Sequence, residues 1–384
     1  MIDRAQISMH PLSEYLTEYK ELNSGNKYRP VAVGRYGIRM RESIYSKDLA
    51  QDYSKNKLIY KGTLTVGMGS VQMDIGILSD DVVYSVSPAY HTYRISGIDY
   101  DYLRYCLQCR NMDMFTRFMK RGSRQGKSID LDRWVGYEIP VYPYEVQLEI
   151  VDRLKLVQSI IDQFQQELDK IDILIKARFV EMFGDPDTNP MGWIERPLSE
   201  MLNVLGGYAF KSEGFSEVDG IPVLRIGNIN AGFFKPVNMV FWEEDESLER
   251  YIMYPGDLVM SLTGTVGKDD YGNVCILGND YDKYYLNQRN AKLELKEGLD
   301  KHYLSQLLRF EKIKKRLTGI SRGVRKANIS NKDILNLSVP IPSADLQLQY
   351  AAFVAQVDKS KVVVQEALNK AQLLFDSLMQ QYFG

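Results

Sequence analysis

The sequence has few of the residues on which disulfide-bonded, metal-binding and hydrolytic proteins depend. Three cysteines in 384 residues are too few, and odd in number, for a disulfide framework. Three histidines argue against a histidine-rich metal site and leave few candidates for an acid–base triad. We therefore expect no metal site and no catalytic centre built on these residue types.

Long apolar runs are also missing. No stretch approaches the ~18 uncharged apolar residues that a membrane-spanning helix needs. Residues 1–10 carry acidic and polar side chains where a signal peptide needs an apolar run. We therefore expect a cytoplasmic protein. Its net charge of −2 gives by itself no reason to expect nucleic acid.

Motifs for nucleotide or metal chemistry are incomplete. The segment GSRQGKS at 122–128 has three residues between its glycines, whereas a P-loop has four, and no apolar strand precedes it. Cys106 and Cys109 form a CxxC inside a helical pattern, and no second pair completes a zinc site. We interpret the first as a basic loop and the second as part of a helix core.

The chain contains an internal repeat. Residues 129–184 match residues 329–384 at an offset of 200 without a gap. The identical pairs include Pro140 and Pro340, Gln147 and Gln347, and Phe183 and Phe383. Upstream, YKGTL at 60–64 resembles YPGDL at 254–258. The order along the chain is therefore globule, helix, globule, helix.

Each repeat ends in a long predicted helix. Between 145 and 181, apolar residues alternate at spacings of four and three, which is a heptad seam, and such a helix would be roughly 55 Å long. The second copy keeps the register and is broken once, at Lys361. Neither helix can bury its seam alone, so we predict that the two helices pair as a spacer coiled coil. A plain bundle core is the alternative.

The two globules combine short β-type runs with helices. Runs such as LTVGMGS, IPVLRI and DLVMSL alternate with turns that contain Gly, Asn and Asp, and amphipathic helices follow near 100–120 and 301–317. We expect an α/β or α+β fold with a twisted, partly antiparallel sheet in each globule. The predicted boundaries are 1–144, 145–184, 185–344 and 345–384, alternating globule and helix.

Positive charge is concentrated in two segments that precede the repeated helices. Residues 104–127 have a net charge of +6 and residues 301–326 of +8. Each segment ends in a Gly- and Ser-containing basic loop, KRGSRQGKS or SRGVRKANIS. Cations at this density suit a phosphate backbone, because binding releases its counterions. A solvated helix face is the alternative for the helical parts.

Several segments of the sequence resemble those of a known family. The stretch WIERPLSEMLNVLGGYAFKSEGF at 193–215, the segments GIPVLRIGNIN, YPGDLVMSLTGTVG and LNQRNAKL, and the closing run SRGVRKANISNKDILNLSVPIPSADLQLQYAAFV are similar to type I restriction-modification specificity subunits. Residues 55–184 resemble a first copy of the same pattern. Residues 1–41 depart from it, because they lack a counterpart of 193–215.

The resemblance implies a function and partners. It implies two similar target recognition domains, each reading one half of a bipartite DNA sequence, separated by two long antiparallel conserved helices that set the gap. Two methyltransferase subunits would dock on the helices, and they, rather than this chain, would bind S-adenosylmethionine and methylate adenine after flipping it. Motor–nuclease subunits would add ATP-driven translocation and cleavage. The chain itself would be non-catalytic and need no cofactor.

Candidate DNA-binding residues follow from the chemistry of base reading. Bidentate or adaptable polar side chains on loops beside strands are suited to base edges, and Lys and Arg to phosphates. In the first domain the candidates are Arg35, Arg39, Arg41, Ser70, Gln72, Tyr90, His91, Arg121, Arg124, Gln125 and Lys127. In the second domain they are Lys211, Ser212, Arg225, Asn228, Asn230, Thr263, Thr265, Lys268, Arg289, Arg325 and Lys326.

Two other functions remain open from the sequence. One globule could contain a methyltransferase or nuclease, which would make the chain a self-sufficient DNA enzyme. Alternatively, the chain could be a coiled-coil adaptor that binds only proteins. Methyl transfer or cleavage by the isolated chain would identify the first, and absence of DNA affinity at low salt would identify the second.

Overall fold

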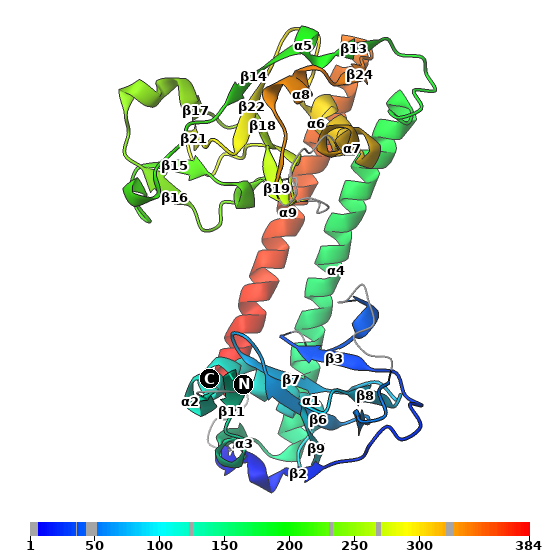
Figure 1. Ribbon diagram of the computed structural model, residues 1–384, viewed down its shortest axis with the longest axis vertical. Helices are drawn as coiled ribbons and strands as arrows, with labels where there is room; N and C mark the ends of the chain where they lie inside the picture. Colours follow the sequence, from blue (N-terminus) through cyan, green and yellow to red (C-terminus); the bar gives the residue numbers. More distant parts are fainter. Residues whose placement is uncertain are drawn as a thin grey trace. The chain divides into compact units, whose positions relative to one another are not determined.

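The computed structural model describes residues 7–35, 37–43, 52–122, 126–229, 233–265, 270–319 and 326–384. The chain divides into two compact units. Unit 1 comprises Met1–Gln165 and Gln365–Gly384, and unit 2 comprises Gln166–Val364. Each long helix contributes one half to each unit, so the two units share the helices rather than carrying one each (Figure 1).

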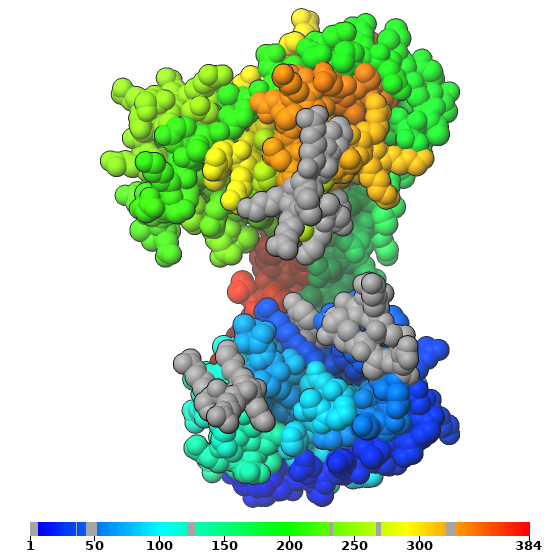
Figure 2. Space-filling view, viewed as in Figure 1, coloured from blue at the N-terminus to red at the C-terminus, as the bar shows by residue number. Residues whose placement is uncertain are grey.

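Unit 1 is built on a four-stranded antiparallel sheet. Its strand order is β2 (Leu16–Tyr19), β9 (His91–Ile95), β6 (Thr63–Met68) and β7 (Met73–Ile77). One face of the sheet packs against α1 (Tyr100–Cys109) and α2 (Asn111–Phe118) through a core that contains Leu64, Val66 and Tyr102. Figure 2 shows that the segments coloured blue to cyan form most of the visible face of this unit.

Smaller strand pairs complete unit 1. A second apolar cluster, which contains Val31, Ile59 and Val86, lies beneath two of these pairs. The pairs are β3 (Val31–Gly34) with β4 (Gly37–Met40), β5 (Lys57–Ile59) with β8 (Tyr84–Val86), β1 (Ser8–Pro11) with β12 (Glu138–Val141), and β10 (Met119–Gly122) with β11 (Gly126–Ile129); α3 (Leu131–Trp134) follows β11.

Unit 2 repeats this plan and adds a second sheet. Its antiparallel sheet has the order β14 (Leu202–Gly206), β22 (Asn290–Leu295), β18 (Leu258–Ser261) and β20 (Val274–Ile276). The second sheet has the order β16 (Val240–Trp242), β15 (Ile221–Leu224), β21 (Tyr284–Leu286) and β17 (Ile252–Met253). In that sheet β15 and β21 run parallel, so the sheets of this unit are partly antiparallel, as predicted.

Helices and short strand pairs complete unit 2, as they do unit 1. They are α6 (Lys301–Arg309), α7 (Glu311–Thr318), α5 (Leu198–Met201), α8 (Asn331–Leu335), the pair β13 (Glu195–Pro197) with β24 (Ser338–Pro340), and the pair β19 (Thr263–Thr265) with β23 (Lys326–Asn328). Short 3-10 helices occupy Leu12–Glu14, Arg41–Ser43, Ser212–Gly214, Ile226–Asn228 and Glu246–Tyr251.

The amphipathic helix predicted in each globule is divided into two. The first copy breaks at Arg110, between α1 and α2, and the second at Phe310, whose backbone is extended at φ −63° and ψ 129°. An extended residue ends the helical hydrogen bonding and redirects the chain. After the break, Met114 and Phe118 of α2, and Ile313 and Leu317 of α7, enter the core of their own unit. The local apolar period predicted the helices but not this change of direction.

The long helices are α4 (Tyr144–Phe183) and α9 (Ala344–Phe383). In unit 1 the first half of α4 packs against the second half of α9, where Leu154 and Val157 share a core with Phe375 and Met379. In unit 2 the other halves pack together, and the hydroxyl of Tyr350 donates to the carbonyl of Ile175 at 3.4 Å. The mixed α/β fold and the long helix α4 are confirmed, and a coiled coil along the full length stays a prediction.

Gln147 and Gln347, identical in the repeat, have the same structural task. Each side chain is buried at the start of its long helix. Gln147 Oε1 accepts from the backbone amide of Asp99 at 2.9 Å, and Gln347 Oε1 accepts from that of Asp300 at 2.8 Å. Asp99 and Asp300 are the N-caps of α1 and α6. The repeated glutamine therefore ties each long helix to the helix pair of its own globule, because a buried amide needs fixed partners.

Lys361, the break in the second apolar seam, has a specific partner. Its ammonium pairs with the carboxylate of Asp172 on α4 at 2.5 Å, and it lies 5.7 Å from the centre of the Phe233 ring. The lysine therefore replaces an apolar contact between α4 and α9 in unit 2 with an ion pair, which explains why the heptad pattern tolerates it.

Candidate nucleic-acid interface

Unit 1 contains a cleft of about 840 Å³ with a mixed polar and apolar lining, and three of the predicted DNA-binding residues line it. Arg35, Arg39 and Gln72 line it, the first two from the β3–β4 hairpin and the third from the turn before β7. Gly37 has φ +78°, a conformation that glycine adopts without a steric penalty, and this allows the tight reversal that presents Arg35. The β3–β4 hairpin therefore places two arginines, and the β6–β7 turn one glutamine, beside a single cleft.

Two further cations line the same cleft and were not singled out in the sequence. Arg104 of α1 and Lys155 of α4 both bind the carboxylate of Asp101, at 2.9 and 2.5 Å. The hydrogen bond to Asp101 raises the pKa of Lys155, so its charge is secured. Asp80 and Asp162 line the cleft as well, so its charged side chains are of both signs. Sequence spacing could not reveal that Lys155 lines the cleft, because Lys155 belongs to the polar flank of a helix.

The remaining candidates of unit 1 have different surroundings. Ser70 is exposed in the β6–β7 turn. The hydroxyl of Tyr90 donates to the carbonyl of Val33 at 2.9 Å, which ties β3 to the main sheet. His91 Nδ1 lies 2.8 Å from a carboxylate oxygen of Glu18 on the neighbouring strand, and Arg41 lies over the ring of Tyr53. Tyr90 therefore has a structural partner in addition to any role at the surface.

The predicted basic loop KRGSRQGKS at 120–128 lies within a β-hairpin formed by β10 and β11. Arg121 and Lys127 are register partners across β10 and β11, and so are Gly122 and Gly126. Paired strands do not form the strand-to-helix loop of a phosphate-binding P-loop, which agrees with our interpretation of GSRQGKS. Arg124 and Gln125 lie outside the described residues.

In unit 2 the structure brings together Thr263, Thr265 and Lys326. Thr265 is the register partner of Lys326, and Thr263 lies two positions along the same β19–β23 ladder. Lys211 and Ser212 are exposed after β14, and Arg289 is exposed in the turn between β21 and β22. Asn230, Lys268 and Arg325 lie outside the described residues.

Asn228 and Arg225 hold a loop together. Asn228 is only 2% exposed, and its side-chain nitrogen donates to the carbonyls of Lys235 and Val237 at 3.0 Å each. Its side-chain oxygen accepts from the backbone amide of Arg225 at 2.9 Å. The Arg225 guanidinium donates to the carbonyl of Asn238. Both donors of the Asn228 amide are therefore used inside the protein, and the reading of a base by Asn228 stays a prediction.

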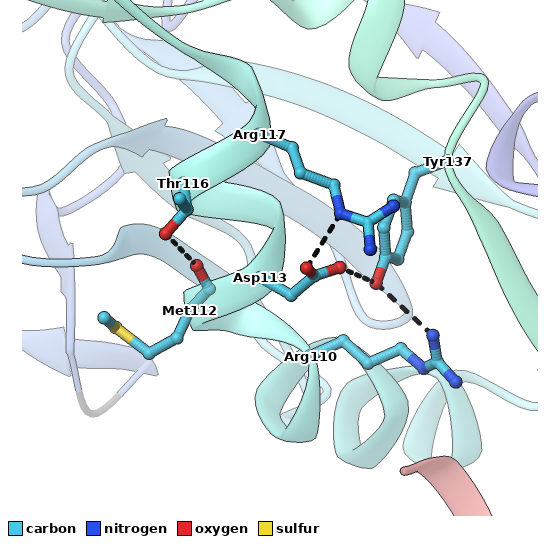
Figure 3. Close-up of polar contacts among 6 residues, drawn as sticks. All are labelled: Arg110, Met112, Asp113, Thr116, Arg117 and Tyr137. Atoms are coloured by element: carbon cyan, nitrogen blue, oxygen red, sulfur yellow. Dashed lines mark hydrogen bonds and ion pairs between the residues drawn. The ribbon is translucent and has the colours of Figure 1, made fainter.

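Much of the predicted positive charge of the helices is engaged within the protein. Arg110, between α1 and α2, donates to the carbonyl of Phe383 at 2.6 Å. On α2, Arg117 binds Asp113 at 2.8 Å (Figure 3). Tyr137 links the two arginines, since its hydroxyl accepts from Arg110 at 3.3 Å and donates to Asp113 at 2.6 Å. The hydrogen bond from Tyr137 is the main cause that lowers the pKa of Asp113. Arg110 thus serves to anchor the end of α9 in unit 1.

The helical segment of unit 2 shows the same behaviour. Lys312 binds Asp187 at 2.6 Å, Lys315 binds Glu311 at 2.5 Å, and Arg316 donates to the carbonyl of Ser338 at 2.8 Å. Exposed ion pairs contribute little to stability, so Lys312 and Lys315 can exchange their partners at small cost. The net charges of +6 and +8 therefore overstate the free positive charge of the helices, as the solvated-face alternative predicted.

The cysteines agree with a structural interpretation. Cys106 is fully buried and Cys109 half-buried on α1, and burial raises the pKa of Cys106 to about 12. Across the described ranges, no group of three or more His, Cys, Asp and Glu side chains could hold a metal ion. In the same residues, no helix combines the length and apolar character that a membrane span needs.

Two α/β units of one plan, each with basic residues beside a short β-ladder, define a tandem-domain binding protein whose units share two long helices. The match to a known family covers most of the second unit. Residues 190–371 match the family model described as the type I restriction modification DNA specificity domain. The resemblance to type I restriction-modification specificity subunits is confirmed.

Named relatives are also type I restriction enzyme specificity subunits. The chain is 25% identical over 253 residues to the type I restriction enzyme MjaVIII specificity subunit of Methanocaldococcus jannaschii, which covers 60% of this chain and 57% of that one. It is 26% identical over 187 residues to the EcoKI specificity subunit of Escherichia coli (strain K12), which covers 45% and 38%. The chain thus spans little more than half the length of the first relative and less of the second.

Solved structures agree on the fold. The S subunit of a type I restriction-modification system from M. genitalium aligns with a TM-score of 0.56 and 13% identity, over 100% of this chain and 98% of that one. A chain from a structural study of complex assembly in the type I R-M system aligns with a TM-score of 0.52 and 15% identity, over 98% and 97%. At these identities the likeness shows the fold alone.

Proposed function

We propose that this chain is the non-catalytic DNA sequence-specificity subunit of a type I restriction-modification complex. The observation that carries the proposal is the specificity-domain match of residues 190–371, together with a first unit built on the same plan. Each unit reads one half of a bipartite, asymmetric DNA target. The helices α4 and α9 connect the two units and set the length of the gap in the DNA target that neither unit reads.

The proposed DNA surface of unit 1 is the cleft with its neighbouring hairpin. Arg35, Arg39 and Gln72 line the cleft, and Ser70 and the β10–β11 hairpin with Arg121 and Lys127 add polar and basic residues. In unit 2 the surface comprises Lys211, Ser212, Thr263, Thr265, Arg289 and Lys326. The hydroxyl and amide groups are suited to base edges, and the cations to phosphates.

The proposed partners include two methyltransferase subunits. Ile173 and Leu174 on α4 are 66% and 50% exposed, and Leu373 and Leu374, at the same repeat positions on α9, are 69% and 51% exposed. Adjacent exposed apolar pairs on a helix are typical of a protein interface. One pair lies in each unit, so the repeat offers two equivalent docking sites. The methyltransferases would bind S-adenosylmethionine, motor–nuclease subunits would hydrolyse ATP, and this chain itself would need no cofactor.

Sequencing of methylated adenines tests the proposal. Genomic DNA from the host, with and without the gene for this chain, is read by single-molecule sequencing. We expect one bipartite, asymmetric motif with methylated adenine that is present with the gene and absent without it. If no methylated motif depends on this gene, the proposal is wrong. It is also wrong if the motif that depends on the gene is one continuous sequence without an unread gap.

Replacing Lys326 with alanine should weaken DNA binding by the assembled complex equally on all sequences. A phosphate contact contributes without reading bases, so the slope of log affinity against log salt should fall by about 1. Lys127→Ala should behave in the same way. Fluorescence anisotropy at several salt concentrations measures the slope, and Lys359→Ala, an exposed lysine of α9, is the control. A change in sequence preference with an unaltered slope would contradict the phosphate role.

A further inference from the structure

Asp74 lies on the strand face that looks toward the β3–β4 hairpin of unit 1. Met73 and Ile75 of β7 pack into the main core, so the alternating residues Asp74 and Gly76 occupy the other face. A Cβ on Gly76 would lie 2.5 Å from the side chain of Ile38 on that hairpin, which shows how closely the hairpin covers this face. Asp74 is therefore held beside the hairpin that carries Arg35 and Arg39.

Glycines make room for the Asp74 carboxylate. One carboxylate oxygen would lie 2.7 Å from a Cβ on Gly69 and 4.0 Å from a Cβ on Gly34. Gly69 is in the β6–β7 turn and Gly34 ends β3, so the carboxylate sits between these two chain reversals. A side chain at Gly69 would have to displace it. The glycines at 34 and 69 thus leave room for this carboxylate near the start of β7.

The side chain of Asp74 is half-buried. Among the described residues, its carboxylate makes no hydrogen bond or ion pair, whereas its backbone pairs with Gly67 in the β6–β7 ladder. Desolvation raises its pKa. A partly desolvated carboxylate that lacks a partner destabilises a fold, so such groups are often kept for binding.

The corresponding position in unit 2 is neutral and has a partner. The β6–β7 register pairs Leu64 with Ile77, and the β18–β20 register pairs Leu258 with Ile276. With Leu64 and Leu258 aligned, Asn273 corresponds to Asp74. The side-chain oxygen of Asn273 accepts from the ammonium of Lys314 at 2.5 Å. The same fold therefore accommodates a neutral, internally bonded residue here, and unit 1 departs from this arrangement.

The chemistry of the surroundings identifies what the carboxylate would bind. Arg35 follows Gly34, beside which the carboxylate lies, and it lines the neighbouring cleft with Arg39 and Gln72. These three side chains suit phosphates and purine edges, whereas a carboxylate repels phosphates. In the major groove a carboxylate accepts from an exocyclic amino group, above all from cytosine N4, and it is repelled by the acceptor oxygens of guanine and thymine. An acid among these residues therefore discriminates between bases rather than adding to overall affinity.

We propose that Asp74 is a specificity-determining residue of unit 1 that accepts a hydrogen bond from an exocyclic base amino group, preferentially cytosine N4, in one half of the DNA target. This inference rests on the proposed function. It assigns to one side chain the rejection of incorrect bases at one position of one half-site. Replacing the carboxylate should leave phosphate contacts intact, so affinity for non-specific DNA should be unchanged or slightly higher.

The test compares Asp74→Asn and Asp74→Ala in the full chain assembled with its methyltransferase subunits. Binding is measured to the target duplex found by methylation sequencing and to duplexes with each other base pair at every half-site position. We expect a loss of discrimination of roughly 10- to 100-fold at one base pair of one half-site. The other half-site should be read as before. Asp81→Asn, which removes an exposed acid beyond the end of β7, is the matched control and should change nothing.

Each result has a distinct meaning. If the wild-type complex yields a bipartite motif and both variants discriminate as the wild type does, the role of Asp74 is refuted while the proposed function stands. A uniform loss of affinity over all sequences, or a lowered melting temperature in both variants, would show a structural role and would also overturn the inference. Absence of any motif in the wild type would instead refute the proposed function itself.

Discussion

Replacing Phe179 with alanine should lower the free energy of unfolding of unit 2 by about 3–5 kcal/mol. Phe179 is completely buried near the end of α4. Its ring stacks on Tyr303 of α6 at 5.3 Å and meets Tyr350 of α9 edge-on at 5.5 Å. Removing the ring would leave a cavity at the point where α4, α6 and α9 meet, and a rigid aromatic cluster cannot collapse to fill it.

Hydrogen exchange followed by mass spectrometry measures this effect where it arises. Peptides of α6 and of the first half of α9 should lose protection, and the midpoint of denaturant unfolding should fall. Val180→Ala, at the next and partly exposed position of α4, is the control and should change stability by no more than about 0.5 kcal/mol. Equal destabilisation by the two variants would show that helix propensity, and not the cluster, determines the stability of this region.

Replacing both Leu373 and Leu374 with aspartate should remove one of the two methyltransferase subunits from the complex. Two carboxylates buried without partners in an apolar interface would cost several kcal/mol, which corresponds to a fall in affinity of more than about 100-fold. The equivalent double substitution at Ile173 and Leu174 should remove the other subunit. The variant with all four substitutions should bind neither. Native mass spectrometry of the assembled complex reads the stoichiometry directly.

The controls for this prediction separate docking from folding. All four side chains are at least half exposed, so the isolated variants should fold and melt as the wild type does. Gln356→Asp, which adds a charge at another exposed position of α9, should leave both methyltransferases bound. A complex that keeps two methyltransferase subunits in the fourfold variant would refute this surface as the docking site without affecting the proposed reading of DNA by the two units.

The repeat and the long helices illustrate what sequence periodicity can predict. Apolar residues at Ile150, Leu154 and Val157 are buried as the seam requires, because a helix exposes one face at a regular interval whatever its neighbours are. The predicted helix at 145–181 differs from α4 by one residue at its start and two at its end. The identity of Gln147 and Gln347 was visible, but its reason, the amides of Asp99 and Asp300, was not.

The candidate site was predictable only in part. Arg35, Arg39 and Gln72 do line one cleft, although 33 positions separate the second from the third along the chain. The charge counts pointed to α1, α2 and α7, where Arg110, Arg117 and Lys312 have internal partners. Charge is a property of composition, whereas pairing depends on which residues the fold brings within about 4 Å. The internal partners of Asn228 were not visible for the same reason, because Lys235 and Val237 lie seven and nine residues further along the chain and only the fold brings them to its amide.

By itself, the sequence determined the duplication, the two long helices, the mixed α/β character and the family, because repeats, apolar periods and motifs are local or register properties of the chain. The tertiary structure alone decided that each helix is divided between the two units and that many helical cations are bound within the protein. It also decided that the Asp74 carboxylate has no partner among the described residues, while Asn273 is bonded. These facts depend on contacts between residues far apart in the sequence. No local pattern encodes which of two chemically similar side chains finds a partner when the chain folds.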